Sequence, residues 1–365
     1  MATLGPNDLK QYALPAGWDG GRLTQIRLES GETYDRLLTE ISAGLSMVNA
    51  GLLADPLTSG LVSVRSDPAV EYRIGVSNGF EVHTEYSKGD AKRGATTGHM
   101  LPLLPYDRKL GWTWDFLRKA RRAQIDADIA SAMDDLRNIW HKKVLTRLFK
   151  STYDAVGSGK SVPFADGGTA DSSFVPVAVP DRGGTFTGSH NHYLRLDGIT
   201  QANVETAVDH LWEHGHDGPY ELRVSSADIS SWTNVTNVTG YIARPDPAIQ
   251  YGANTPLANV DASYIGVINT NYGACRLVAS GRIPTKYWSL YKSYGPLDQR
   301  NPLAVRESPT YGLGAVLLAG DHIRQFPLEN AILFFEFGVG VGEDRTAGVA
   351  VYNHTSGSYT SPTIS

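Results

Sequence analysis

Two stretches of the chain carry apolar residues every three or four positions, which is the spacing of an amphipathic helix. In residues 33–48 the apolar positions include Leu37, Ile41, Leu45 and Val48. In residues 123–149 they are Ile125, Ile129, Met133, Leu136, Trp140, Val144 and Leu148. Acidic side chains gather in the first half of the second stretch and basic ones in its last turns, as the helix dipole favours. At about 1.5 Å per residue, this second helix is expected to be ~40 Å long.

Between the two helices the pattern changes to alternation, which is typical of a half-buried strand. One face of residues 69–76 carries Val70, Tyr72, Ile74 and Val76. A glycine-rich turn at 86–98 follows, with the charged residues Lys88, Asp90, Lys92 and Arg93. A second extended segment covers 99–114, so we expect a long β-hairpin of roughly 18 residues per arm. Because a lone two-stranded ribbon is only marginally stable in water, we expect it to pack on another surface, such as a second subunit.

The second half of the chain mixes helical and alternating patterns. It predicts strands near 174–179 and 192–196, a helix over 201–214, a strand over 220–225, a short helix after it and several strands towards the end. Strands and helices that do not alternate regularly favour the α+β class.

Composition and charge exclude several kinds of partner. The 365 residues are 41% hydrophobic and 19% charged, as in ordinary globular proteins. The net charge of -5 gives no electrostatic footprint for strong nucleic-acid binding. The longest apolar run, 311–320, is too short to cross a bilayer, so we expect no membrane partner. The single cysteine, Cys275, excludes an intramolecular disulfide and a cysteine-based zinc cluster.

Five of the ten histidines fall between residues 190 and 216, at His190, His192, His210, His214 and His216. His210 and His214 are four apart and share a helix face, so they could chelate zinc. The metalloprotease motif HExxH is absent, however, and Gly215 is suited to a left-handed helix cap. A histidine-rich helix end is also favoured by the helix dipole. We favour the helix end, and expect no metal, no cofactor and no catalytic residue.

The stretch GSGKS at 157–161 is similar to the end of a phosphate-binding loop. The full motif needs a glycine six positions before Lys160, where this chain has Asp154, and it follows a strand rather than a helix. We therefore expect no nucleotide site there.

The order of parts is an arm, an amphipathic helix, a long hairpin, a long helix, a glycine-rich loop, a mixed unit and late strands. This order resembles the major capsid proteins of tailed bacteriophages, whose Hong Kong 97-like fold encapsulins share. The segments that carry the resemblance are the hairpin 69–112, the helix 123–149, the helix-turn-strand unit 199–232 and the closing strands 330–354.

The resemblance implies an α+β, Hong Kong 97-like capsid fold with five consecutive parts. They are an N-terminal arm with an amphipathic helix (1–65), an extended β-hairpin loop (66–112), the spine helix of a peripheral domain (113–155), a mainly axial domain (156–310), and return strands with a C-terminal tail (311–365).

The function implied is that of a non-enzymatic shell subunit, assembling through pentamers and hexamers into an icosahedral capsid around double-stranded DNA. The DNA would be contacted without sequence specificity. Besides copies of itself, the expected partners are a separate scaffolding protein and a portal, with a decoration protein left open. The chain would belong to the virion and assemble in the cytoplasm of a bacterial host.

In such shells the extended loop lies across the neighbouring subunit. The resemblance therefore implies inter-subunit contacts at Val70, Tyr72, Ile74, Val76, Lys88, Asp90, Lys92 and Arg93. Two alternatives remain. The first is an encapsulin-type nanocompartment of the same fold. The second is a zinc-dependent hydrolase that uses His210, His214 and a third histidine of the 190–216 cluster.

Overall fold

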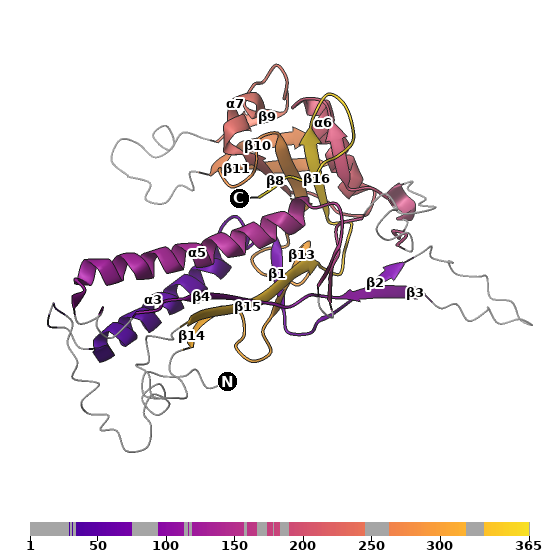
Figure 1. Cartoon of the computed structure of the whole chain (residues 1–365). Helices are drawn as coiled ribbons and strands as arrows, with labels where there is room; N and C mark the ends of the chain where they lie inside the picture. Colours follow the sequence, from indigo (N-terminus) through magenta and orange to yellow (C-terminus); the bar gives the residue numbers. More distant parts are fainter. Residues whose placement is uncertain are drawn as a thin grey trace, which may run out of the picture. The chain divides into compact units, whose positions relative to one another are not determined.

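Both helices predicted from apolar spacing are present in the computed structural model of the chain (Figure 1). Helix α3 covers Tyr34–Ala54 and α5 covers Arg122–Phe149. Along α3 the buried positions are Leu37, Ile41, Leu45, Val48 and Leu52, which are three or four residues apart. The same spacing in α5 buries Ile125, Met133, Leu136, Trp140, Val144 and Leu148.

The structure describes residues 29, 31, 34–74, 94–112, 116, 119–156, 159–165, 174–177, 179–182, 190–244, 263–318 and 332–364. The chain forms two compact units, each assembled from three separate stretches. The helical unit comprises 1–55, 103–141 and 306–338. The sheet unit comprises 56–102, 142–305 and 339–365.

In the helical unit, α3 lies alongside the part of α5 up to His141 (Figure 1). Three antiparallel strands accompany the helices, with β15 (Ile332–Val341) between β14 (Ala315–Leu318) and β4 (Leu104–Lys109). Trp140 of α5 packs on Phe337 of β15, with ring centroids 5.5 Å apart. Asn49 of α3 both donates to and accepts from the backbone of Ala315 in β14, at 2.9 Å each.

The sheet unit is built around one mixed seven-stranded sheet. Its strands in spatial order are β7 (Tyr193–Leu196), β16 (Gly348–Asn353), β12 (Tyr287–Lys292), β8 (Tyr220–Ser225), β11 (Gly273–Ser280), β10 (Tyr264–Thr270) and β9 (Tyr241–Ala243). Strand β1 (Val62–Arg65) pairs with β13 (Leu303–Glu307). The two-stranded sheets are β2 (Ala69–Ile74) with β3 (Ala95–Met100) and β5 (Asp154–Val156) with β6 (Gly159–Ser161). Of the closing strands, β16 belongs to this sheet, whereas β14 lies in the helical unit.

Helix α6 (Gln201–Trp212) covers the sheet through Val204, Val208 and Leu211, which are fully buried. It begins where the Thr200 side chain accepts a hydrogen bond from the backbone N–H of Asn203, a typical N-cap. Beyond its end Gly215 has φ +94°, which confirms the predicted left-handed cap. Short helices follow β8, with η2 at Ser226–Asp228 and α7 at Ile229–Trp232.

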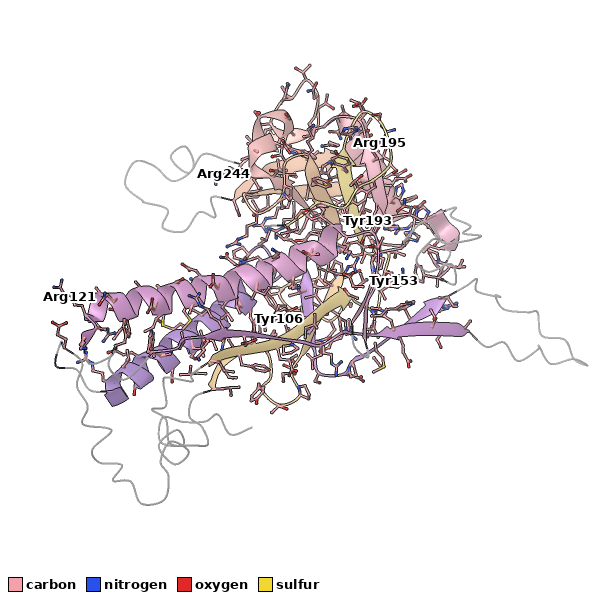
Figure 2. All side chains as sticks on the ribbon, in the orientation of Figure 1. Tyr106, Arg121, Tyr153, Tyr193, Arg195 and Arg244 are labelled. Atoms are coloured by element: carbon pink, nitrogen blue, oxygen red, sulfur yellow. The ribbon has the colours of Figure 1, made fainter. Side chains whose placement is uncertain are left out.

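Hydrogen bonds hold the C-terminal segment against the rest of the sheet unit. Arg195 of β7 donates hydrogen bonds to the carbonyl oxygens of His354, Thr355 and Gly357 (Figure 2). The Tyr359 hydroxyl donates to the carbonyl oxygen of Phe149, at 2.6 Å. The polar tail is thus partly packed on the sheet unit.

Two local predictions were wrong. No strand forms in the described part of 174–179, where Pro176 cannot donate a ladder hydrogen bond. The second arm of the hairpin is shorter than predicted, because β4 pairs with β15 instead of continuing the ribbon. Pro102 lies at the break between β3 and β4.

No helix among the described residues is long and apolar enough to cross a membrane.

Candidate functional site

The base of the predicted hairpin is a ribbon of two six-residue strands in the sheet unit. β2 and β3 are antiparallel, with a register from Ala69 opposite Met100 to Ile74 opposite Ala95. Side chains alternate along β2 as the sequence predicts, with Val70 and Tyr72 on the buried face and Glu71 and Arg73 exposed. We call these twelve residues the ribbon base.

The buried face of the ribbon base packs within its own unit. Val70 and Tyr72 are 0% and 7% exposed and lie in a cluster with Leu101, Ala165, Phe174 and Ala304, and Ile74 packs at its edge. The rings of Tyr72 and Phe174 meet edge to face, with centroids 5.4 Å apart. This differs from the expectation that Val70 and Tyr72 cover a neighbouring subunit. Their apolar area is already removed from water by residues far away in the sequence.

A buried arginine anchors this cluster. Arg345 is 1% exposed, and its guanidinium lies over the ring of Phe174, 4.4 Å from the centroid. Its Nε donates to the carbonyl oxygen of Pro163 at 3.1 Å, and its Nη1 donates to the Tyr72 hydroxyl at 3.4 Å. Planar stacking and several donors suit arginine to such a position. The ribbon base is therefore attached to its own unit by packing and by hydrogen bonds.

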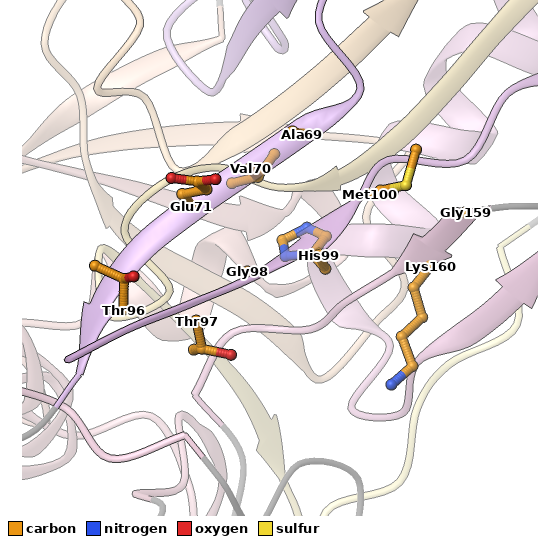
Figure 3. Close-up of a pocket in the computed structure, with 10 residues that line it drawn as sticks. All are labelled: Ala69, Val70, Glu71, Thr96, Thr97, Gly98, His99, Met100, Gly159 and Lys160. Atoms are coloured by element: carbon orange, nitrogen blue, oxygen red, sulfur yellow. The ribbon is translucent and has the colours of Figure 1, made fainter.

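The opposite side of the ribbon base borders an open groove of about 630 Å³ (Figure 3). Glu71 of β2, Thr96 of β3 and Lys160 of β6 are exposed residues in its lining. The apolar side chain of Met100 is 47% exposed at the same groove. Methionine is enriched in protein contact surfaces, and polar residues form the rim around them.

Five of the eight predicted contact residues lie outside the described residues. They are Val76 and the charged residues Lys88, Asp90, Lys92 and Arg93. Their role in contacts between subunits stays a prediction. Residues 159–161 of the GSGKS stretch form strand β6 rather than the start of a helix.

The histidine-rich stretches converge in the sheet unit. His190 and His192 lie on the segment that leads into β7, and His210 and His214 lie at the end of α6. His192 Nε2 is 3.1 Å from His214 Nε2. Glu213, the C-cap of α6, places Oε1 2.7 Å from His190 Nε2. The preferred interpretation as a simple helix end therefore missed the gathering of four imidazoles and a carboxylate.

Burial controls the charge of this cluster. Burial, together with repulsion from His190, lowers the pKa of His214 to about 3. Burial and the neighbouring imidazoles also hold the pKa of His192 well below its usual value, and burial lowers the pKa of His210. Burial alone would raise the pKa of Glu213, but the contact with His190 holds it below its usual value.

His216 is separate from the other four. Its Nε2 lies 3.1 Å from the hydroxyl of Thr346 and 3.3 Å from Asp344 Oδ2. The zinc-hydrolase hypothesis allowed His216 as a third ligand. In the structure, however, His216 belongs to a separate hydrogen-bond network.

Cys275 lies in β11 and is fully buried, and burial raises the pKa of its thiol to about 12. The thiolate needed for nucleophilic chemistry is therefore scarce at neutral pH.

Comparisons with known proteins show a likeness in structure but none in sequence. No family model matches the chain, and no curated protein matches it. The fold is similar to that of a chain from Mycobacterium phage Patience, with a TM-score of 0.63 and 21% identity, covering 96% of this chain and 97% of that one.

Weaker likenesses include the mature capsid of bacteriophage PhiM1 and an encapsulin complex from Synechococcus elongatus. The first has a TM-score of 0.44 and 13% identity and covers 82% of this chain and 87% of that one. The second has a TM-score of 0.42 and 10% identity and covers 81% and 89%. No conclusion is based on these two likenesses, whose TM-scores are below 0.5. The likeness that spans both chains bears out the order of elements read from the sequence: this chain has a mixed helix-and-sheet, Hong Kong 97-like fold.

Proposed function

We propose that the chain is the major capsid protein of a tailed bacteriophage, a shell subunit rather than an enzyme. The observation that carries the proposal is the likeness over almost the whole of both chains to a protein of Mycobacterium phage Patience. Because the likeness covers 96% of this chain, it extends over both compact units.

The ribbon base supports this function by fixing the place from which the hairpin leaves the sheet unit. Tyr72 and Arg345 hold β2 to its own unit, and β2 pairs with β3, the strand that follows the predicted loop. The predicted loop, which would contact a neighbour through Lys88, Asp90, Lys92 and Arg93, would then begin and end at a fixed pair of strands. Such charged contacts set register and partner choice more than affinity.

The groove beside the ribbon base is the described surface that we propose for contact with another copy. Glu71 and Lys160 offer opposite charges for pairing, and Met100 offers apolar area. Contact through two different patches gives closed rings when the rotation between copies closes. Pentamers and hexamers that combine into an icosahedral shell are assemblies of this kind.

The other partners follow from the same proposal. The shell would enclose double-stranded DNA, which a chain with a net charge of -5 would contact without sequence specificity. A separate scaffolding protein and a portal would take part in assembly, and the mature protein would belong to the virion. An encapsulin-type compartment, which would hold a cargo enzyme instead of DNA, is the alternative of the same fold.

The direct test is negative-stain electron microscopy of the purified protein under assembly conditions. We expect closed shells, and elution in the void volume on size exclusion. A protein that stays monomeric, with or without the scaffolding protein from its own gene neighbourhood, would contradict the proposal. Neighbouring genes for a terminase and a portal would support the phage capsid, whereas a peroxidase or ferritin-like gene would support the compartment.

A further inference from the structure

Four imidazoles and one carboxylate from two remote segments converge on one spot in the sheet unit. One nitrogen from each of His190, His192 and His214 lies within 4.8 Å of the others. His190, His210 and Glu213 meet the same limit, so that His190 belongs to both groups. The ring centroids of His190 and His192 are 5.1 Å apart, and those of His192 and His214 are 5.0 Å apart. The four imidazoles thus lie close to one another in one cluster.

The hydrogen bonds of two rings direct their lone pairs towards the cluster. His192 Nδ1 lies 2.9 Å from the carbonyl oxygen of Gly348, and His210 Nδ1 lies 2.9 Å from that of Thr206. A carbonyl oxygen only accepts, so each Nδ1 carries the proton and donates it. In a neutral ring the lone pair is then on Nε2. A backbone carbonyl that accepts from the outer nitrogen is the usual support of a metal-binding histidine.

The separations between the ligand atoms fit a small divalent ion. With Zn–N distances of 2.0–2.1 Å, two nitrogens of a tetrahedral zinc site are about 3.4 Å apart. His192 Nε2 and His214 Nε2 are 3.1 Å apart, close to that value. Glu213 Oε1 lies 3.9 Å from His214 Nε2 and 2.7 Å from His190 Nε2, so it completes the shell after a small side-chain movement away from His190.

We propose that the sheet unit binds one divalent transition-metal ion, preferentially Zn²⁺, through the imidazoles of His190, His192 and His214, with Glu213 as the adjoining carboxylate. Imidazole and carboxylate ligands without cysteine suit Zn²⁺ and its neighbours in the periodic table. The ion would tie the segment before β7 to the end of α6. Its role is structural, and it does not depend on the shell function proposed above.

The rival explanation is a hydrogen bond between His192 and His214, with His190 and Glu213 forming an ion pair. Under that explanation the cluster is complete without metal. The two explanations differ in whether Zn²⁺ binds with a defined stoichiometry, so direct metal binding separates them.

The experiment uses the full-length chain without a histidine tag, dialysed against a chelator and then titrated with ZnCl₂ by isothermal calorimetry. We expect one Zn²⁺ per chain. Titration with Co²⁺ should give the intense visible absorption of a tetrahedral site. His190→Ala and His214→Ala should each weaken Zn²⁺ binding roughly tenfold or more. Far-ultraviolet circular dichroism checks that each variant is folded.

The matched control is His354→Ala, which removes an imidazole of the sheet unit that belongs to neither group. It should bind Zn²⁺ as the unaltered chain does. Because His214 is 2% exposed, its loss can affect folding, whereas His190 is 25% exposed and tolerates truncation better. Less than stoichiometric Zn²⁺ in the unaltered chain, or equal binding by His190→Ala and His354→Ala, would overturn the inference in favour of the hydrogen-bonded cluster.

Discussion

Single buried polar side chains join separate segments of the sheet unit. Arg147 is 2% exposed and donates to the carbonyl oxygens of Ser161, at 2.7 Å, and Thr152, at 2.9 Å. Arg345 donates to the Tyr72 hydroxyl of the ribbon base and to the carbonyl oxygen of Pro163. A buried charge is tolerated when most of its donors are used, so each arginine fixes the backbone around it.

In the same unit, the ring of Phe164 fills the space that a side chain at Gly348 would need. A Cβ on Gly348 would lie 2.7 Å from Cε1 and 2.8 Å from Cε2 of Phe164, whose ring is fully buried. We expect Gly348→Ala to lower the free energy of unfolding by about 1–3 kcal/mol, because the ring cannot move without disturbing its neighbours. Urea unfolding measures the change.

The control is Gly44→Ala in α3, where the space around a new Cβ is open. Alanine should raise the free energy of unfolding there by roughly 0.5–1 kcal/mol, because a helical glycine is entropically unfavourable. A Gly348→Ala protein as stable as the Gly44→Ala protein would show that the Phe164 ring relaxes freely.

Between elements, an ion pair joins the two predicted helices of the helical unit. Glu40 of α3 pairs with Arg122 in the first turn of α5, and Arg36 contacts the same carboxylate at 3.0 Å. Hydrogen bonds from Arg122 and Arg36 hold the pKa of Glu40 below its usual value of 4.5.

This pair predicts a small loss of stability in acid. A carboxylate with a lowered pKa stabilises the folded state above the unfolded pKa of 4.5, and the contribution disappears as the pH falls below that value. Glu40→Gln should therefore lower the free energy of unfolding by at most about 1 kcal/mol at pH 7, since the pair is partly exposed. The difference should shrink at pH 3 and in 1 M salt. A difference that persists in both conditions would mean that packing, not charge, is responsible.

Two neighbouring residues of β2, one buried and one exposed, test whether the ribbon base is held by packing within its own unit. Tyr72→Ala should cost about 3 kcal/mol, because it empties a buried site between Phe174 and Arg345. Arg73→Ala, one residue further on the exposed face, should change stability by less than about 0.5 kcal/mol. Thermal unfolding of the two variants checks the difference. Equal midpoints would indicate that the ribbon base is not held by its own unit.

At the scale of the whole molecule, each compact unit is assembled from three stretches, so neither corresponds to one continuous piece of chain. A truncation at any single point therefore removes part of a core. The predicted hairpin can be tested separately, because the buried cluster around Val70 and Tyr72 lies at the ribbon base.

Removal of residues 86–93 tests the assembly role of the hairpin. We expect the midpoint of thermal unfolding to stay unchanged, since β2, β3 and their buried cluster are kept. Shells seen by electron microscopy should be lost, because the predicted contacts of Lys88, Asp90, Lys92 and Arg93 go with the deletion. Normal shells from the deleted chain would refute this role of the hairpin.

The sequence alone determined the elements whose signal is local. The apolar spacing predicted α3, α5 and α6, alternation predicted β2 and β8, and Gly215 predicted the end of α6. The order of these elements also indicated the Hong Kong 97-like fold. Each of these patterns needs only neighbouring residues, because helix and strand periodicity is a property of the backbone.

Only the tertiary structure decided which remote segments meet. Phe174 and Arg345 come from more than 70 residues away to bury the ribbon base, and no periodicity within 69–76 could reveal them. In the same way, His190 and His192 reach His214 because β7 and α6 pack in one unit. Spacing tells which face of an element is apolar, but what covers that face depends on how the whole chain is folded.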